Sequence, residues 1–301
     1  MLEGITVLDF STRLPGPLGA SLLAARGARV IKVEDINRPD PFVCDDPLFS
    51  TWYQTLNEKK ELVRLDFDGP NIHSELLTLF KGAQAVIAPD KKSLEALITP
   101  LAPMVWLTLS ASRSGGKART LHDLNILALK KILSLHARLS QEPVIAPPFL
   151  PVAGIAFGSS LAISLLSALV AAMKSSTCVR VSCSLEQAVE EQLHLLYPES
   201  LEQSGASHFL HNGNYPCYNI YRTKDKHAVA FAAIESRLWI RFCQIFNCPI
   251  EADKRMTARS QDPTLIASVA NIFKELTLSE LKSILAHEPD GEDLCITPFE
   301  L

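Results

Sequence analysis

A short loop near the amino terminus has the residue types that can hold an anion or a polarised carbonyl group. The loop Arg13-Leu14-Pro15-Gly16-Pro17 follows the apolar run 5–10 and precedes a stretch of helical composition. A sharp turn directly before a helix points backbone N–H groups and the positive end of the helix dipole at such a ligand. A tight turn between a strand and a helix needs the same residues for structural reasons alone, so the loop by itself leaves both alternatives open.

Composition and missing motifs exclude several classes of function. The chain contains no G-x-G-x-x-G fingerprint and no Walker lysine, which disfavours a standard dinucleotide or nucleoside triphosphate site. Its seven cysteines include no C-x-x-C pair, so we expect no metal, no disulfide framework and reduced thiols in a cytoplasmic location. The net charge of -4 gives no general attraction to nucleic acid.

The first third of the chain alternates strand-like and helix-like segments. The apolar run 5–10, a helical stretch 18–26 closed by Gly27 and a second apolar run 28–33 form a β-α-β pattern. A right-handed crossover makes the two strands parallel and places the loop at their carboxyl ends, where open α/β sheets bind ligands. The alternation continues with a helix over 71–81, a strand over 85–88, a helix over 92–98 and a strand over 104–109. We therefore predict an α/β fold with a Rossmann-like doubly wound parallel sheet.

The remainder predicts further helices and a second domain. Apolar residues recur at helical spacing over 121–135, and the run 152–173 is almost entirely apolar. The second run is long enough for a membrane span, but its glycines and serines favour a buried central helix, so we expect no span. We predict a large domain over 1–199 and a smaller α+β domain over 200–301.

Several segments, spread over almost the whole chain, are similar to one known family. They are Phe10 to Pro17, Gly27 to Glu34, Arg38-Pro39-Asp40, Asn57 to Glu61, Thr120 to Ala128, Pro147 to Ser159, Gly213 to Asp225, Ala232 to Ser236 and Cys295 to Pro298. In this order they resemble the family III CoA-transferases, also called the CaiB/BaiF family. The resemblance is greatest to the alpha-methylacyl-CoA racemase branch, because His122 stands where transferases more often have tyrosine.

The resemblance implies that coenzyme A or an acyl-CoA thioester is the ligand, with no other cofactor required. Arg13 and Pro15 belong to the loop that faces the ligand, and Val33 ends the strand that frames the adenine. The phosphates would meet Arg38 and one lysine of the pair Lys59-Lys60. Arginine offers a planar fork to phosphate and lysine a mobile point charge. Each of these cations taken alone is equally typical of a solvated surface.

The same resemblance implies a pair of proton carriers, of which one is missing. His122 would be one base, with Glu235 as the partner that fixes its tautomer; an imidazole so held carries protons near neutral pH. The family's catalytic aspartate is replaced by Gly154, which has no side chain. Asp123 is the first candidate for a substitute acid. A histidine at a helix start without any catalytic role is the structural alternative.

Two functions therefore remain open. The first is an enzyme of acyl-CoA thioesters in which CoA transfer through an acyl anhydride is lost and racemisation is impaired, since inversion needs a proton carrier on each face. The second is a catalytically inactive CoA-binding module or dimer scaffold that sequesters ligand or pairs with an active paralogue. The resemblance implies a homodimer. The chain ends shortly after Thr297-Pro298, so we expect the family's C-terminal return segment to be missing.

Overall fold

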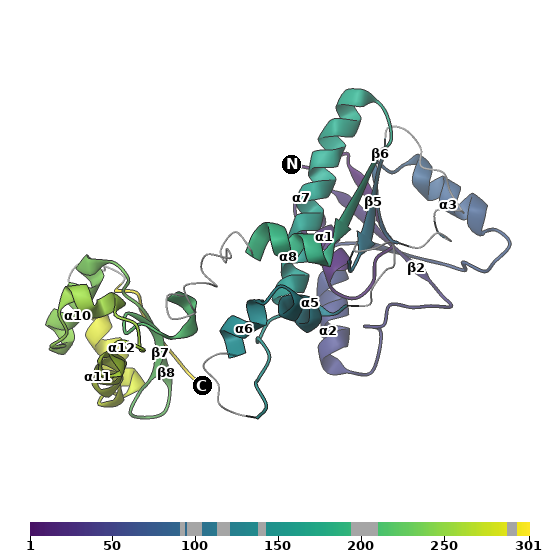
Figure 1. The fold of residues 1–301 in the computed structure, drawn as a ribbon. Helices are drawn as coiled ribbons and strands as arrows, with labels where there is room; N and C mark the ends of the chain where they lie inside the picture. Colours follow the sequence, from purple (N-terminus) through teal and green to yellow (C-terminus); the bar gives the residue numbers. More distant parts are fainter. Residues whose placement is uncertain (91–93, 95–103, 113–120, 138–142, 194–209, 288–293) are drawn as a thin grey trace. The chain divides into compact units, whose positions relative to one another are not determined.

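The computed structural model describes residues 1–90, 94, 104–112, 121–137, 143–193, 210–287 and 294–301. The chain divides into two compact units, each with its own core (Figure 1). Unit 1 comprises Met1–Ser134 and Val144–Leu196, and unit 2 comprises Leu135–Pro143 and Tyr197–Leu301. The predicted border at residues 199 and 200 lies outside the described residues, so that division stays a prediction.

Unit 1 is built on a six-stranded parallel sheet of order β3-β2-β1-β4-β5-β6. The strands are β1 (Thr6–Asp9), β2 (Arg29–Asp35), β3 (Glu61–Leu65), β4 (Ala85–Pro89), β5 (Val105–Ser110) and β6 (Val179–Ser184). The strand order reverses between β1 and β4, which is where doubly wound folds bind their ligands. The predicted fold class is confirmed.

Helices cover both faces of this sheet. Successive residues of a strand point to opposite faces, so Val7 joins one core and Leu8 the other. The Val7 side packs against α1 (Pro15–Ala24), α5 (Asp123–Leu129), α7 (Val152–Ser175) and α8 (Leu185–Leu193). The Leu8 side packs against α3 (Ile72–Lys81). Both faces are apolar, which explains why the strands appear as continuous apolar runs.

The long helix α7 is a core helix of unit 1, as expected. It is the one described helix that is long and apolar enough to cross a membrane, yet 56% of its most apolar window is buried inside the protein. Gly19 of α1 and Gly158 of α7 allow the two helices to approach closely, since a Cβ on Gly19 would lie 2.8 Å from the Gly158 carbonyl oxygen. Elsewhere on α7, the side chains of Ile163 and Met173 are more than half exposed.

Two helices differ from the sequence prediction. The helix expected over 121–135 is divided into α5 and α6 (Ile132–Ala137), because Lys131 adopts a left-handed conformation with φ of 60° between them. Helix α1 begins at Pro15, three residues before the predicted start, because proline is compatible with the first helical turn. Of the helix expected over 92–98, only Leu94 is among the described residues.

Helix α2 (Pro47–Asn57) and strand β3 were not predicted. Asp46 caps α2, and its Oδ1 accepts hydrogen bonds from the backbone N–H groups of Leu48 at 2.9 Å and Phe49 at 3.2 Å. The Tyr53 hydroxyl donates to the Glu34 Oε1 at 2.8 Å and ties α2 to β2. This bond holds α2 beside the carboxyl end of β2, so the apolar residues of α2 can contact a ligand at that edge of unit 1.

Unit 2 is a smaller α+β unit, as predicted. Its antiparallel sheet has the order β7-β8-β9, formed by β7 (Tyr218–Arg222), β8 (Ala228–Ala232) and β9 (Ile296–Phe299). Its helices are α10 (Ser236–Phe246), α11 (Pro263–Lys274) and α12 (Leu278–Ala286), with short 3₁₀ turns over Leu210–Asn212 and Ala252–Met256. Phe231, Trp239, Phe242 and Phe273 pack ring against ring in its core.

Candidate active site

The candidate site lies at the carboxyl ends of the unit 1 strands, and its first part is the loop between β1 and α1. Asp9, the last residue of β1, is fully buried beneath this loop. Its Oδ1 accepts a hydrogen bond from the backbone N–H of Ser11 at 3.0 Å and another from the Ser11 hydroxyl. Its Oδ2 lies 2.9 Å from the Lys60 Nζ. A buried ion pair therefore supports the loop.

The electrostatics of this pair hold Asp9 ionised. Burial opposes ionisation, but the ammonium groups of Lys60 and Lys32 outweigh it and lower the pKa of Asp9 below its ordinary value of 3.8. Lys60 also donates to the Pro17 carbonyl oxygen and the Asn57 Oδ1, each at 2.9 Å. All three N–H groups of this ammonium are thus in use, and its side chain is 1% exposed. In this structure the Lys60 ammonium holds the loop, and its predicted contact with the coenzyme phosphates stays a prediction.

A second buried pair fixes the backbone of Arg13. Arg13 has a left-handed backbone with φ of 65°, a conformation that costs a non-glycine residue energy. Its N–H donates to both carboxylate oxygens of Asp40 at 3.0 Å, and Asp40 in turn lies 3.6 Å from the Lys32 Nζ. Asp40 and Lys32 are each 1% exposed. The exposed Arg13 side chain is thereby placed at the edge of a cleft.

This main cleft has a volume of about 680 Å³ and lies wholly within unit 1. Predicted residues from three separate segments line it, namely Arg13 and Pro15, then His122 and Asp123, then Gly154. The other lining residues are Thr12, Leu14, Pro41, Phe42, Phe49, Trp52, Ala111, Leu121, Pro151 and Leu185. A cleft of this size suits an organic acyl group or a small cofactor.

Three aromatic side chains form an apolar wall of the main cleft. The rings of Phe42 and Phe49 stack with centroids 4.9 Å apart, and Trp52 lies 5.8 and 6.0 Å from them. We call these three residues the aromatic wall. Phe49 and Trp52 are one turn apart on α2, so they share a face of that helix. The sequence analysis did not identify them, although the spacing of three residues was a usable signal.

Asp123 also lines the main cleft, where it contacts the start of helix α7. The Asp123 Oδ1 accepts a hydrogen bond from the backbone N–H of Gly154 at 2.6 Å. Burial raises the pKa of Asp123 above 3.8, although the N–H groups of Gly154 and Ala153 act to lower it. A Cβ built on Gly154 would lie 3.6 Å from this oxygen and 3.0 Å from the Leu14 Cδ2. A carboxylate is therefore present beside position 154, supplied by α5.

His122 and Glu235, the predicted catalytic partners, lie in different units. His122 is the N-cap residue of α5, exposed to the cleft, and its backbone N–H donates to the Asn125 Oδ1 at 3.0 Å. Glu235 is the exposed N-cap residue of α10 in unit 2. Their pairing stays a prediction, because each unit is described by itself.

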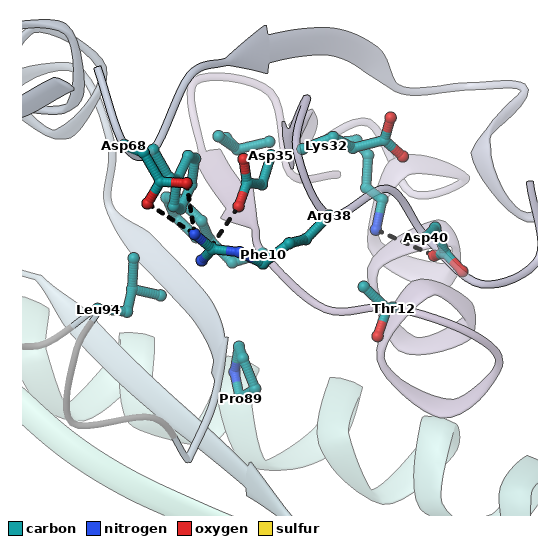
Figure 2. A pocket seen from close by; sticks show the side chains of 12 residues that line it. Phe10, Thr12, Lys32, Asp35, Arg38, Asp40, Asp68, Pro89 and Leu94 are labelled. Atoms are coloured by element: carbon teal, nitrogen blue, oxygen red, sulfur yellow. Dashed lines mark hydrogen bonds and ion pairs between the residues drawn. The ribbon is translucent and has the colours of Figure 1, made fainter. Parts of the chain in front are cut away.

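A second hollow, of about 280 Å³, lies where β1, β2 and β4 end (Figure 2). Val33 and Arg38, two of the predicted coenzyme-binding residues, line it. Figure 2 shows Arg38 reaching toward Asp35 and Asp68; its guanidinium lies 2.6 Å from the Asp68 carboxylate and 3.4 Å from that of Asp35. Arg38 is 63% exposed, so a ligand can reach it. Lys59 is exposed and lines neither cavity.

The chemistry available here is proton transfer and anion binding. Within the ranges that the structure describes, no group of three His, Cys, Asp or Glu side chains is placed to hold a metal ion. Asp9, Lys32 and Asp40, which position the loop, were not predicted as site residues. The sequence feature that could have identified such residues is a charged residue inside an apolar run, as with Lys32 in the run 28–33.

Comparison with known proteins gives one consistent result. The model of CoA-transferase family III matches residues 2–97 and 112–295. The alpha-methylacyl-CoA racemases of Homo sapiens and Mus musculus are 26% and 24% identical over 312 residues, which cover 99% of this chain and 77% of each racemase. A CaiB/BaiF family protein from Brucella suis has a TM-score of 0.72 at 18% identity, covering 95% of this chain and 81% of that one. The predicted resemblance is confirmed.

Proposed function

We propose that this chain, which belongs to CoA-transferase family III, binds an acyl-CoA thioester with the acyl end in the main cleft and exchanges its α-proton weakly. The name of the human relative, alpha-methylacyl-CoA racemase, suggests a 2-methyl-branched acyl group. One observation carries the proposal: the Asp123 carboxylate lies in the main cleft, 3.6 Å from the place where the Cβ of an aspartate at position 154 would be.

Asp123 is the group that we assign to proton removal. Its burial raises its pKa, which brings the carboxylate nearer to the range in which a general base works well. The α C–H bond of the thioester breaks, its electron pair moves onto the thioester carbonyl to give the enolate, and Asp123 takes the proton. The proton returns from Asp123, from His122 or from water. The start of α7 places the positive end of a helix dipole near the enolate oxygen.

Covalent CoA transfer is not part of this proposal. That reaction needs a carboxylate that attacks the acyl carbon and forms an anhydride. Gly154 has no such group, and the Asp123 Oδ1 is already bonded to the Gly154 N–H. We therefore expect proton exchange without acyl transfer to a second acid.

Incubation of the protein with a 2-methylacyl-CoA in deuterated water tests the chemistry. We expect slow incorporation of deuterium at the α-carbon, detected by mass spectrometry, and a loss of this incorporation in Asp123→Asn. If calorimetry demonstrates binding of the thioester but no deuterium enters above the rate without protein, the assignment of proton chemistry is wrong.

For the coenzyme, we propose that the second hollow holds the adenosine and phosphate end. Val33 supplies an apolar surface and Arg38 a phosphate-binding fork, in competition with Asp68. Arg38→Ala should weaken CoA binding about tenfold, because a charge-assisted hydrogen bond to phosphate is lost. Asp68→Asn should instead tighten it, because the substitution frees Arg38 and removes a negative charge. Arg26→Ala is the matched control, because Arg26 is an exposed cation just beyond the end of α1 that donates to the Leu22 carbonyl oxygen and lines neither cavity.

A second candidate is a binding module that catalyses no reaction. Gly154 favours this candidate, because it lacks the carboxylate of the family's catalytic aspartate. In that case Asp123 serves only as the cap of α7, and the chain binds CoA, forms a homodimer or pairs with an active paralogue in the cytoplasm. Binding of CoA without deuterium exchange would support this candidate. Sedimentation of the purified chain measures the homodimer, and a purely monomeric chain that does not bind CoA would exclude it.

A further inference from the structure

Two cysteines meet at the carboxyl end of helix α10, far along the chain from the site residues of unit 1. The helix ends at Phe246, and Asn247 then adopts a left-handed backbone with φ of 52° and ψ of 40°. The backbone N–H of Cys248 donates to the carbonyl oxygen of Cys243 at 3.0 Å. This is the hydrogen bond of a Schellman ending, in which the chain turns back on the last helical turn.

The ending brings the two cysteine side chains together. In a Schellman ending the residue that donates this bond and the residue that accepts it make a side-chain contact. Here both of these positions are cysteines, and the Cys243 thiol lies 3.5 Å from the Ile250 carbonyl oxygen, two residues beyond Cys248. Two residues joined by such a backbone bond also have Cα atoms within the separation that a disulfide spans, roughly 4.4–6.8 Å. Both thiols are free in this structure.

We propose that Cys243 and Cys248 are a redox-active pair that closes to an intramolecular disulfide on reaction with a low-molecular-weight disulfide such as oxidised glutathione. The Cys243 thiolate attacks one glutathione sulfur, and the other glutathione leaves as a thiolate that takes up a proton. The Cys248 thiolate then attacks the Cys243 sulfur and displaces the second glutathione. Two protein thiols are oxidised, and one glutathione disulfide is reduced to two glutathione molecules.

The surroundings of the pair determine the order and the rate of these steps. Cys243 is partly exposed whereas Cys248 is 8% exposed, so Cys243 meets the oxidant first. Burial raises the pKa of Cys243 to about 12, which keeps the thiolate scarce and the first step slow near neutral pH. The second step is intramolecular and follows quickly. Glu235 begins the same helix, so the disulfide fixes the far end of the element that carries this predicted site residue.

Peptide mapping of the whole protein tests the proposal directly. Trypsin cleaves after Arg241 and after Lys254, so both cysteines lie in the single peptide 242–254. After incubation with oxidised glutathione and blocking of free thiols, we expect this peptide to be lighter by two hydrogen atoms than its reduced form and to carry no blocking group. Dithiothreitol should restore two reactive thiols. We also expect a rise of a few degrees in the melting temperature of unit 2 on oxidation.

Variants separate a true pair from general thiol oxidation. Cys248→Ser should leave glutathione attached to Cys243, because no second thiol displaces it, and Cys243→Ser should leave Cys248 unmodified. Cys178→Ser, a partly exposed cysteine of unit 1, is the matched control and should form the disulfide as the unaltered protein does. The proposal is overturned if peptide 242–254 of the unaltered protein still takes up two blocking groups, or if it retains glutathione as the end product.

Discussion

Placing a carboxylate at position 154 is the change that most directly tests the site. In Gly154→Asp the new Cβ lies 3.0 Å from the Leu14 Cδ2, so the end of a flexible side chain must move by a few tenths of an ångström. The position is in the first turn of α7, where an acidic residue gains roughly 0.3–1 kcal/mol from the helix dipole. Replacing a helical glycine contributes roughly 0.5–1 kcal/mol more. These two gains offset part of the electrostatic repulsion from Asp123, so we expect the variant to fold.

The main cost is repulsion between the new carboxylate and Asp123. Two carboxylates about 5 Å apart interact with ~3 kcal/mol at an effective dielectric constant of about 20. Asp123 is half-buried, and its pKa is already raised by that burial. The repulsion raises the pKa of one carboxyl further, so the two groups titrate as a coupled pair in which one carboxyl gives a proton and the other takes one.

That pair, together with His122, restores a proton carrier on each side of the α-carbon. We expect racemisation of a single enantiomer of 2-methylacyl-CoA to rise about 10²–10⁴-fold over the unaltered protein. Chiral chromatography of the hydrolysed product measures the rate, and Gly154→Asn is the control of equal size that cannot carry a proton. If the aspartate variant folds and binds the thioester but racemises no faster than the asparagine variant, the assignment of this site is refuted.

Three further predictions concern other parts of unit 1. Asp9→Asn leaves the Lys60 ammonium buried without its carboxylate partner and should lower the free energy of unfolding, measured in urea, by about 3–5 kcal/mol. Asp68→Asn is the control at an exposed ion pair and should lower it by about 1 kcal/mol or less. Because the folded-state pKa of Asp9 lies below 3.8, its contribution to stability is present above that pH and is lost as pH falls through the lower folded value. In an acid titration, the difference in unfolding free energy between the unaltered protein and Asp9→Asn should therefore be constant above this range and shrink within it. Trp52→Ala removes a ring of the aromatic wall and should weaken binding of an acyl-CoA about tenfold, whereas the affinity for CoA itself should not change. An equal loss of affinity for both ligands would contradict the placement of the acyl group in the main cleft.

The general fold could be predicted because its strands and helices are apolar in distinct patterns. Strands β1, β2, β4 and β5 are covered on both faces, so each has successive apolar residues, although Asp9 and Lys32 interrupt the first two. Helix α2 has no fully buried residue, and β3 is a mixed strand at the sheet edge, so neither stands out as an apolar run. Both were missed for that reason.

The sequence by itself determined the family, the doubly wound fold and the identity of the residue at position 154. Only the tertiary structure decided which charged side chains are buried in ion pairs and which are exposed. Adjacent lysines 59 and 60 look equivalent in the sequence, yet Lys60 is buried on Asp9 whereas Lys59 is exposed. Likewise, Asp123 reaches the N–H of Gly154 across 31 positions of the chain. Such pairings depend on how distant segments pack, because a buried charge is stable only where another segment supplies its partner.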